Sequence, residues 1–264
     1  MFFLVAVVAV SIAAGAWWMQ RIVFTPDATR ATAAAILQEP DIRLDINSLV
    51  SAESALVLDR PITEISTEVE SQVLSTRAGA LMMAPIIEQL HERIIGLRDD
   101  PVEITGVQMI EIVRDQRAAD ANTVTMPVDP IGTLANMRGL LSWLMLIGAG
   151  LGLIMFLLGV ITRPERRDVL RGLGELGLAL AASMLVFGYF LPVHMMTAID
   201  NQTWTHAIPN LAMRTLPVVL GAIAIFALAG TVLILASASS GKRRQWSTPL
   251  SVARYRGGEN PGWG

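Results

Sequence analysis

The chain has 264 residues, a hydrophobic content of 53% and a formal net charge of −3. Its mean hydropathy of +0.52 excludes an ordinary soluble protein, and the absence of cysteine excludes disulfides, thiol redox chemistry and cysteine-based zinc sites. The charge is segregated: residues 21–138 hold 18 acids and 10 bases, a net charge of −8, whereas nine of the ten other bases lie in 163–171 and 242–256.

Four apolar runs are each close to the ~20 residues that a helix needs to cross the hydrocarbon of a bilayer. Two of them, Leu140–Ile161 and Leu216–Ala236, contain no charged residue, whereas a soluble helix of that length would carry a polar stripe. The sequence therefore predicts a mostly α polytopic membrane protein with four transmembrane helices, at residues 1–20, 139–162, 172–192 and 216–237.

The first run also resembles a signal peptide, because Ala14-Gly15-Ala16 is similar to a cleavage site. No basic residue precedes the run in this sequence, and Trp17 and Trp18 suit the interfacial belt of a membrane helix. We expect an uncleaved signal anchor. Cleavage would leave three spans and the same location for everything else.

The segment at 21–138 is predicted to form an extracytoplasmic α-rich domain with at most one small strand pair. Three helical stripes each have a proline in or just before the first turn, at Asp27–Gln38, Pro61–Thr76 and Pro85–Leu97. Apolar residues alternate with polar ones around Val102–Ile104 and Val124–Val128, which predicts two short paired strands.

The positive-inside rule assigns the basic hinge at 163–171 and the basic tail at 238–264 to the cytoplasm. Both termini are then cytoplasmic, and the 21–138 domain and the 193–215 loop are extracytoplasmic. The predicted location is the cell membrane, crossed several times.

Gly172, Gly174 and Gly177 spell G-x-G-x-x-G, the pattern of a dinucleotide-binding loop. Such a loop follows a strand in a βαβ unit, whereas this one follows an apolar run of helix length. Glycines also let membrane helices pack closely, and we favour that role here, as for the G-x-x-x-G of Gly148 and Gly152. The glycine-faced spans are expected to pack in an oligomer.

The ionisable side chains near the spans give little indication of a relay or metal site. Glu175 lies four residues after Arg171 and is predicted to form an interfacial salt bridge with it rather than a proton or ion relay. His194, Asp200 and His206 lie in the predicted 193–215 loop, but their spacing matches no local zinc-ligand motif.

His91-Glu92 begins the metalloprotease pattern H-E-x-x-H, but Ile95 stands where the second histidine is required. The sequence contains no phosphate-loop, hydrolase or kinase signature. We therefore predict no catalytic residue, no cofactor and no metal ligand.

Three stretches resemble a family of largely uncharacterised actinobacterial integral membrane proteins: RIVFTPDATRATAAAILQEPDIR, IEQLHERIIGLRDDPVEITGVQMIEIV and QWSTPLSVARYR. The resemblance covers most of the chain. It implies the order of a first span, an extracytoplasmic helical domain, three spans and a basic tail, and it assigns no activity and no catalytic residues.

The sequence thus predicts a non-enzymatic component of the cell envelope, acting in interaction or assembly or as an accessory subunit of a membrane complex. The expected partners are membrane lipids and either further copies of the chain or other membrane or envelope proteins. Nucleic acid is not expected, because the arginines lack an aromatic platform. The alternative is a transport subunit or mechanotransmitter working with a separate ATPase, since the topology is similar to that of permeases of the FtsX and MacB kind.

Overall fold

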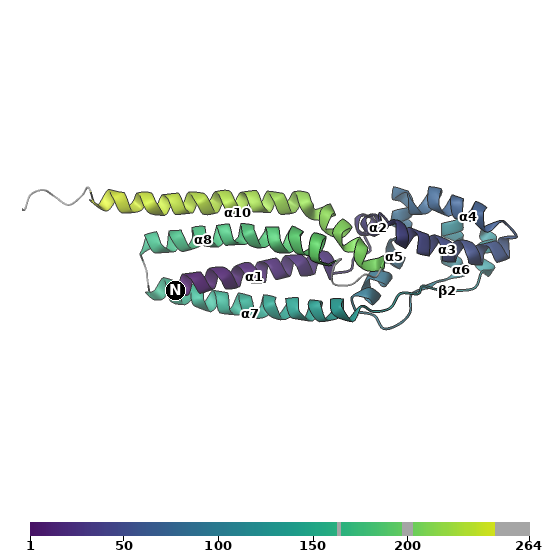
Figure 1. Ribbon diagram of the computed structural model, residues 1–264, viewed down its shortest axis with the longest axis horizontal. Coiled ribbons are helices and arrows are strands. Elements are labelled where there is room, and N and C mark those ends of the chain that lie inside the picture. Colours follow the sequence, from purple (N-terminus) through teal and green to yellow (C-terminus); the bar gives the residue numbers. More distant parts are fainter. Residues whose placement is uncertain (163–164, 197–202, 246–264) are drawn as a thin grey trace, which may run out of the picture.

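The computed structural model describes residues 1–162, 165–196 and 203–245. Four helices of the described residues are long and apolar. They lie side by side, with a group of shorter helices beyond one end of them (Figure 1). We call the four long helices the bundle and residues 24–131 the helical domain. The predicted mostly α fold is confirmed at this level.

The bundle consists of α1 (Phe2–Val23), α7 (Gly132–Thr162), α8 (Arg166–Leu185) and α10 (Ala207–Gln245). A π-helix, η3 (Val186–Met195), continues α8, and a 3-10 helix, η4 (Thr203–His206), precedes α10. All four long helices are long and apolar enough to cross a membrane, as the four apolar runs predict.

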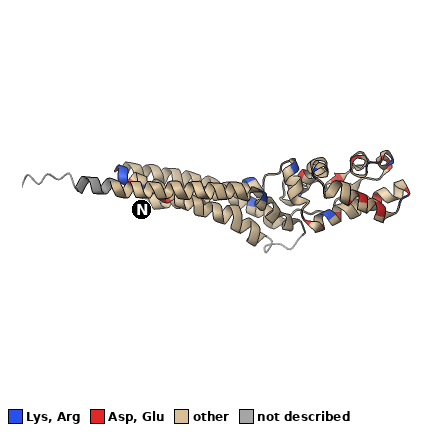
Figure 2. Cartoon of the chain, turned by 90° about the horizontal axis from the view of Figure 1, so that it is seen from above, with Lys and Arg blue, Asp and Glu red and all other residues tan. Residues whose placement is uncertain are grey.

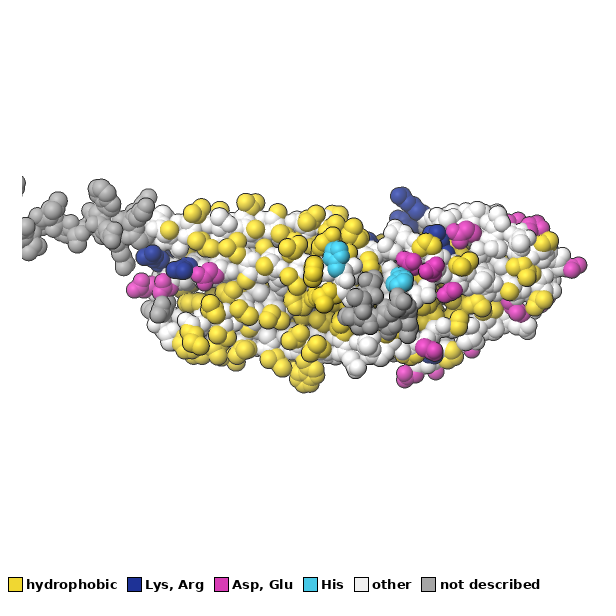
Figure 3. All heavy atoms as spheres, viewed as in Figure 1, with side chains coloured by type: hydrophobic (Ala, Val, Ile, Leu, Met, Phe, Trp, Pro, Cys, Tyr) yellow, Lys and Arg dark blue, Asp and Glu magenta, His cyan; other side chains and the backbone are white. Residues whose placement is uncertain are grey.

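The four bundle helices form a row in the order α7, α1, α8, α10 (Figure 1). Each helix contacts its neighbours in the row, so α1 and α8 are central and α7 and α10 are flanking. Apolar side chains cover much of the bundle surface, whereas acidic side chains lie mainly on the helical domain (Figure 3). An apolar outer surface is what a lipid environment requires of spanning helices.

Glycines of α7 allow this helix to pack closely on α1. A Cβ atom on Gly148 would lie 2.8 Å from the backbone oxygen of Ala9, and one on Gly152 would lie 2.5 Å from Val10 Cγ2. The predicted packing role of these glycines is confirmed. Because α1 covers them within the same chain, they give no support to the oligomer contact expected from the sequence.

The helices α8 and α10 also pack closely through glycines. Gly174 and Gly177 of α8 face Gly230 of α10, and a Cβ atom on Gly230 would lie 2.7 Å from the backbone oxygen of Gly174. The G-x-G-x-x-G pattern lies within a helix that follows another helix, so it does not form a strand-to-helix phosphate loop. Its glycines provide contacts within the bundle.

The helical domain contains nine short elements. They are α2 (Arg30–Ile36), α3 (Pro40–Leu58), α4 (Ile62–Val69), the π-helix η1 (Glu70–Leu74), α5 (Arg77–Ile94), β1 (Glu103–Ile104), α6 (Gly106–Val113), the 3-10 helix η2 (Gln116–Asp120) and β2 (Val124–Thr125). The two strands pair antiparallel, which confirms the predicted strand pair. The core is formed by fully buried side chains that include Ile42, Ile46, Ile65, Met83 and Met109.

One predicted helix start is wrong. The helix α5 begins at Arg77 rather than at Pro85, because the Thr76 side chain accepts a hydrogen bond from Gly79 N and caps the helix there. Pro85 lies inside α5 on its exposed face. The residue whose backbone carbonyl loses its helical partner to the proline ring, Leu81, is itself exposed.

Two helices, α3 and α6, were not predicted from the sequence. The helix α3 has Pro40 in its first turn and buries Ile42 and Ile46. The helix α6 begins with a capping box, in which Thr105 and Gln108 satisfy each other's backbone N–H groups. The predicted ranges Asp27–Gln38 and Pro61–Thr76 do contain α2 and α4.

The bundle helices extend beyond the ranges predicted from hydropathy. The helix α7 begins at Gly132 rather than 139, and α10 begins at Ala207, so part of the predicted 193–215 loop is helical. The helix α8 begins at Arg166, inside the predicted 163–171 hinge. Hydropathy marks only the apolar part of a helix, whereas backbone hydrogen bonds continue past it.

Candidate functional site at the junction of the bundle and the helical domain

One hydrophobic core runs from the bundle into the helical domain. Val23 at the end of α1, Ile36 of α2, Ile94 of α5, Leu134 of α7 and Leu211 of α10 are all buried in it. The helical domain is therefore packed on the bundle and not merely tethered to it. We call the ends of these five helices the junction.

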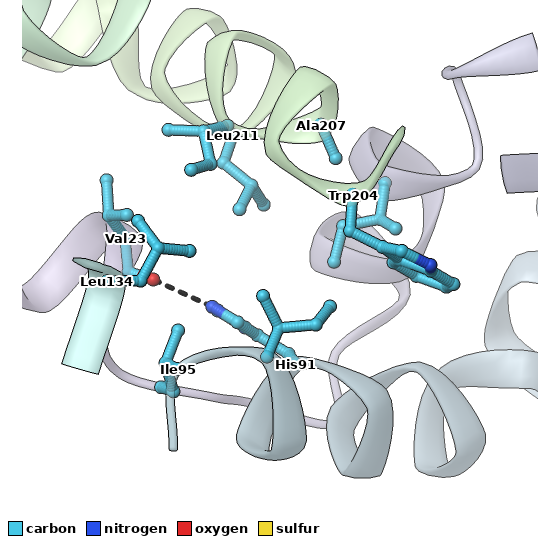
Figure 4. Close-up of a pocket in the computed structure, with 10 residues that line it drawn as sticks. Val23, His91, Ile95, Leu134, Trp204, Ala207 and Leu211 are labelled. Atoms are coloured by element: carbon cyan, nitrogen blue, oxygen red, sulfur yellow. Dashed lines mark hydrogen bonds between the residues drawn. The ribbon is translucent and has the colours of Figure 1, made fainter. Parts of the chain in front are cut away.

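An apolar cavity lies inside the junction (Figure 4). The cavity is small, with a volume of about 20 Å³, and its walls include Val23, His91, Leu134, Trp204, Ala207 and Leu211. Among the lining residues, His91 alone has an ionisable side chain. The cavity is therefore a hydrophobic space with one polar group on its wall.

His91 fixes the end of α1 (Figure 4). Its Nε2 lies 2.7 Å from the backbone oxygen of Val23, one of the last carbonyls of α1, which has no partner inside its own helix. The imidazole thus carries its proton on Nε2, and its Nδ1 has no hydrogen-bond partner among the described residues. Burial lowers the pKa of His91 despite the bond to Val23, so the neutral form is favoured.

Arg214 joins α10 to the segment before α2. Its guanidinium donates a hydrogen bond to Thr32 Oγ1 and lies 4.0 Å from the carboxylate of Asp27. Thr29 Oγ1 donates to the same carboxylate at 2.8 Å, and Thr32 Oγ1 also donates to it. Burial alone would raise the pKa of Asp27, but the hydrogen bonds from Thr32 and Thr29, with the charge of Arg214, hold it below its ordinary value.

Two helices that leave the junction are irregular. The π-helix η3 contains Pro192, and α10 contains Pro217, three residues after Arg214. Figure 1 shows the first turns of α10 inclined to the remainder of that helix. Proline removes a backbone hydrogen bond and bends a helix, and π segments occur often at functional sites.

His194 and His206, two of the three side chains in the predicted loop, have different surroundings. His194 packs against aromatic rings of η3, and Asp200 lies outside the described residues. His206 instead lies beside Glu39 and Asp41 at the start of α3, and the ligand atoms of these three lie within 4.8 Å of one another. Sequence reasoning missed both acids because more than half of the chain separates them from His206.

The predicted salt bridge between Arg171 and Glu175 is confirmed. Arg171 Nε lies 2.9 Å from Glu175 Oε1, on the first turns of α8 and far from the junction along the bundle. Glu175 therefore has a structural partner at the end of a span.

The fold and the junction define a class of protein: a multi-pass α-helical membrane protein in which a helical domain is packed on one end of four spans. Comparison of the chain with protein-family models, with curated proteins and with solved structures finds no match. The resemblance to the actinobacterial family stays a prediction, and the function has to be inferred from the geometry.

Proposed function

We propose that the protein is a non-enzymatic component of the cell envelope that binds a partner through its helical domain and holds it at a fixed position on the membrane. The shared hydrophobic core of the junction supports this proposal most strongly. A domain packed on the ends of α1, α7 and α10 keeps its position relative to the membrane, whereas a domain on flexible linkers does not.

In this proposal the helical domain lies outside the cytoplasm. Arg166, Arg167 and Arg171 lie on the first turns of α8, at the end of the bundle remote from the helical domain, and Figure 2 shows basic residues there. The positive-inside rule assigns that end to the cytoplasm. The excess of acids in 21–138 favours a partner with a basic surface.

The orientation is tested with single cysteines, because the natural chain has none. A cysteine at Thr67, which is exposed in α4, should react with a membrane-impermeant maleimide on intact cells. A cysteine at Thr248 should react only after the cells are opened. The reverse pattern would overturn the orientation.

The partner is tested by photo-crosslinking in cells. Crosslinking amino acids at the exposed Leu56 and Val107 of the helical domain should yield the same adduct, identified by mass spectrometry. The exposed Leu228 of α10 is the matched control on the bundle surface and should not yield that adduct. Adducts from the bundle position alone would contradict a partner-binding role of the helical domain.

The second candidate function is a transport subunit or mechanotransmitter that works with an ATPase. The inclined first turns of α10 (Figure 1), the presence of Pro217 in that helix and the π-helix η3 favour it, because these features lie where spans leave the junction. A force on the helical domain would reach the bent helix through Arg214. This candidate requires an ATPase that co-purifies in mild detergent, with an ATPase rate that falls in an Arg214→Ala variant; absence of any ATPase would exclude it.

A further inference from the structure

We propose that Glu39, Asp41 and His206 bind one divalent transition-metal ion, of the zinc or manganese class, which links the helical domain to the bundle. Glu39 and Asp41 flank Pro40 at the start of α3, and His206 is the last residue of η4, directly before α10. The ligand atoms of the three side chains lie within 4.8 Å of one another. The inference does not rest on the proposed partner binding.

Three ligands at this separation fit a metal ion after small side-chain rotations. Bonds of about 2.0–2.2 Å to imidazole nitrogen and carboxylate oxygen place neighbouring ligand atoms roughly 3.3–3.6 Å apart in a tetrahedral site. No capping hydrogen bond to α3 holds the Glu39 side chain in its present rotamer. Asp41 is exposed and can also move toward the other two.

The local charge favours a bound cation. Within the described part of the chain, no Lys or Arg forms an ion pair with Glu39 or Asp41; the nearby Arg43 pairs with Glu70 at 3.1 Å. Asp45, one turn along α3, adds further negative charge beside Asp41. Acidic residues at the start of α3 also stabilise the N-terminus of that helix. This role does not explain why His206, from a distant part of the chain, lies beside them.

The donor set indicates which metal would bind. One imidazole with two carboxylates suits zinc, manganese or iron, whereas all-oxygen sites suit magnesium and calcium. Three protein ligands leave a coordination position for water. Glu39 and Asp41 belong to the helical domain and His206 precedes a span, so the ion would hold the two parts together at the junction.

The test is metal binding by the full-length chain in detergent micelles, purified without a polyhistidine tag because such a tag binds the same ions. Calorimetric titration with ZnCl₂ and with MnCl₂ should show one site per chain for at least one of them. His206→Ala and a Glu39→Gln, Asp41→Asn double variant should each weaken binding by about tenfold or more. His194→Ala is the matched control and should bind as the natural chain does, since His194 packs on rings outside the site.

A second measurement distinguishes a metal site from a simple contact between His206 and the two acids. Saturating metal should raise the Tm of the natural chain and of His194→Ala, by on the order of 5 °C at a hundredfold excess over Kd, and should not raise that of His206→Ala. The isosteric Glu39→Gln, Asp41→Asn variant gives the same readout if His206→Ala fails to fold. No binding isotherm with either ion, or full affinity in His206→Ala, would show the proposal to be wrong.

Discussion

The contact between α8 and α10 depends on Gly230, and an alanine there should force the two helices apart. A Cβ atom on Gly230 would lie 2.7 Å from the backbone oxygen of Gly174 and 2.9 Å from the backbone nitrogen of Leu178. Both atoms belong to the backbone of α8, so no side-chain rotation relieves the clash. Gly221 in the same helix is the matched control, because a Cβ atom there would meet no atom within 4 Å.

The expected change in stability on replacing Gly230 by alanine follows from two opposed effects. Replacing glycine by alanine inside a helix stabilises it by about 0.8–1.0 kcal/mol, and this gain is common to both positions. Overpacking of a well-packed contact costs about 1–3 kcal/mol, and this cost falls on Gly230→Ala alone. The difference between the two variants isolates the overpacking cost, so Gly230→Ala should be about 1–3 kcal/mol less stable than Gly221→Ala.

The assay is reversible unfolding in detergent micelles, followed by circular dichroism, with the two variants and the natural chain measured side by side. Gly221→Ala should be as stable as the natural chain or more stable, and Gly230→Ala should unfold earlier. Equal stability of the two variants would refute the close approach of α8 and α10, and with it the packing role of the glycines.

Three further predictions concern the junction and the helical domain. The stability of the natural chain should fall as the pH drops below 6.5, by up to about 1.4 kcal/mol per pH unit, because His91 takes up a proton more readily when unfolded; His91→Gln should remove this contribution in pH-dependent unfolding. Arg214→Ala should weaken the attachment of α10 to Asp27 and speed hydrogen exchange of the amides at 27–36, and unchanged exchange would contradict the contact. Thr105→Ala should destabilise the chain by about 1 kcal/mol through loss of the capping box, whereas the exposed Thr123→Ala should have no measurable effect in the same unfolding assay.

Local patterns account for the parts of the fold that the sequence predicts. The four spans follow from apolar runs, because a helix must cover the hydrocarbon thickness with apolar side chains. The pair of Arg171 and Glu175 follows from a spacing of four residues on a helix. The strand pair follows from the alternation around Ile104 and Val124. Each of these features is marked by a pattern within a short stretch of the sequence.

The junction could not be predicted because its contacts join segments that are remote in sequence. Arg214 reaches Asp27 and Thr32, and His206 reaches the start of α3, at spacings that no helical or strand period marks. The start of α5 was missed for a different reason. Pro85 is an ordinary helix-start signal, but the cap at Thr76 and solvent access beside the proline ring allow the helix to pass through it.

The glycine contacts divide the bundle into two closely packed pairs of helices, α7 with α1 and α8 with α10. Within each pair, a glycine of one helix lies against backbone atoms of the other. Movement of one helix along the other would therefore produce a steric clash. Between the pairs, α1 and α8 meet through side chains. A Cβ atom on Gly15 would lie 2.5 Å from Phe187 Cδ2, and Ser183 Oγ donates a hydrogen bond to the backbone oxygen of Ser11.

The helical domain is attached to both pairs. His91 holds the end of α1 at Val23, and the segment at Asp27 and Thr32 holds α10 at Arg214. The contact between α1 and α8 is thus formed by side chains and a buried hydrogen bond, whereas the contacts within each pair depend on helix backbones. The two attachments therefore fall on different pairs, because α1 belongs to one and α10 to the other.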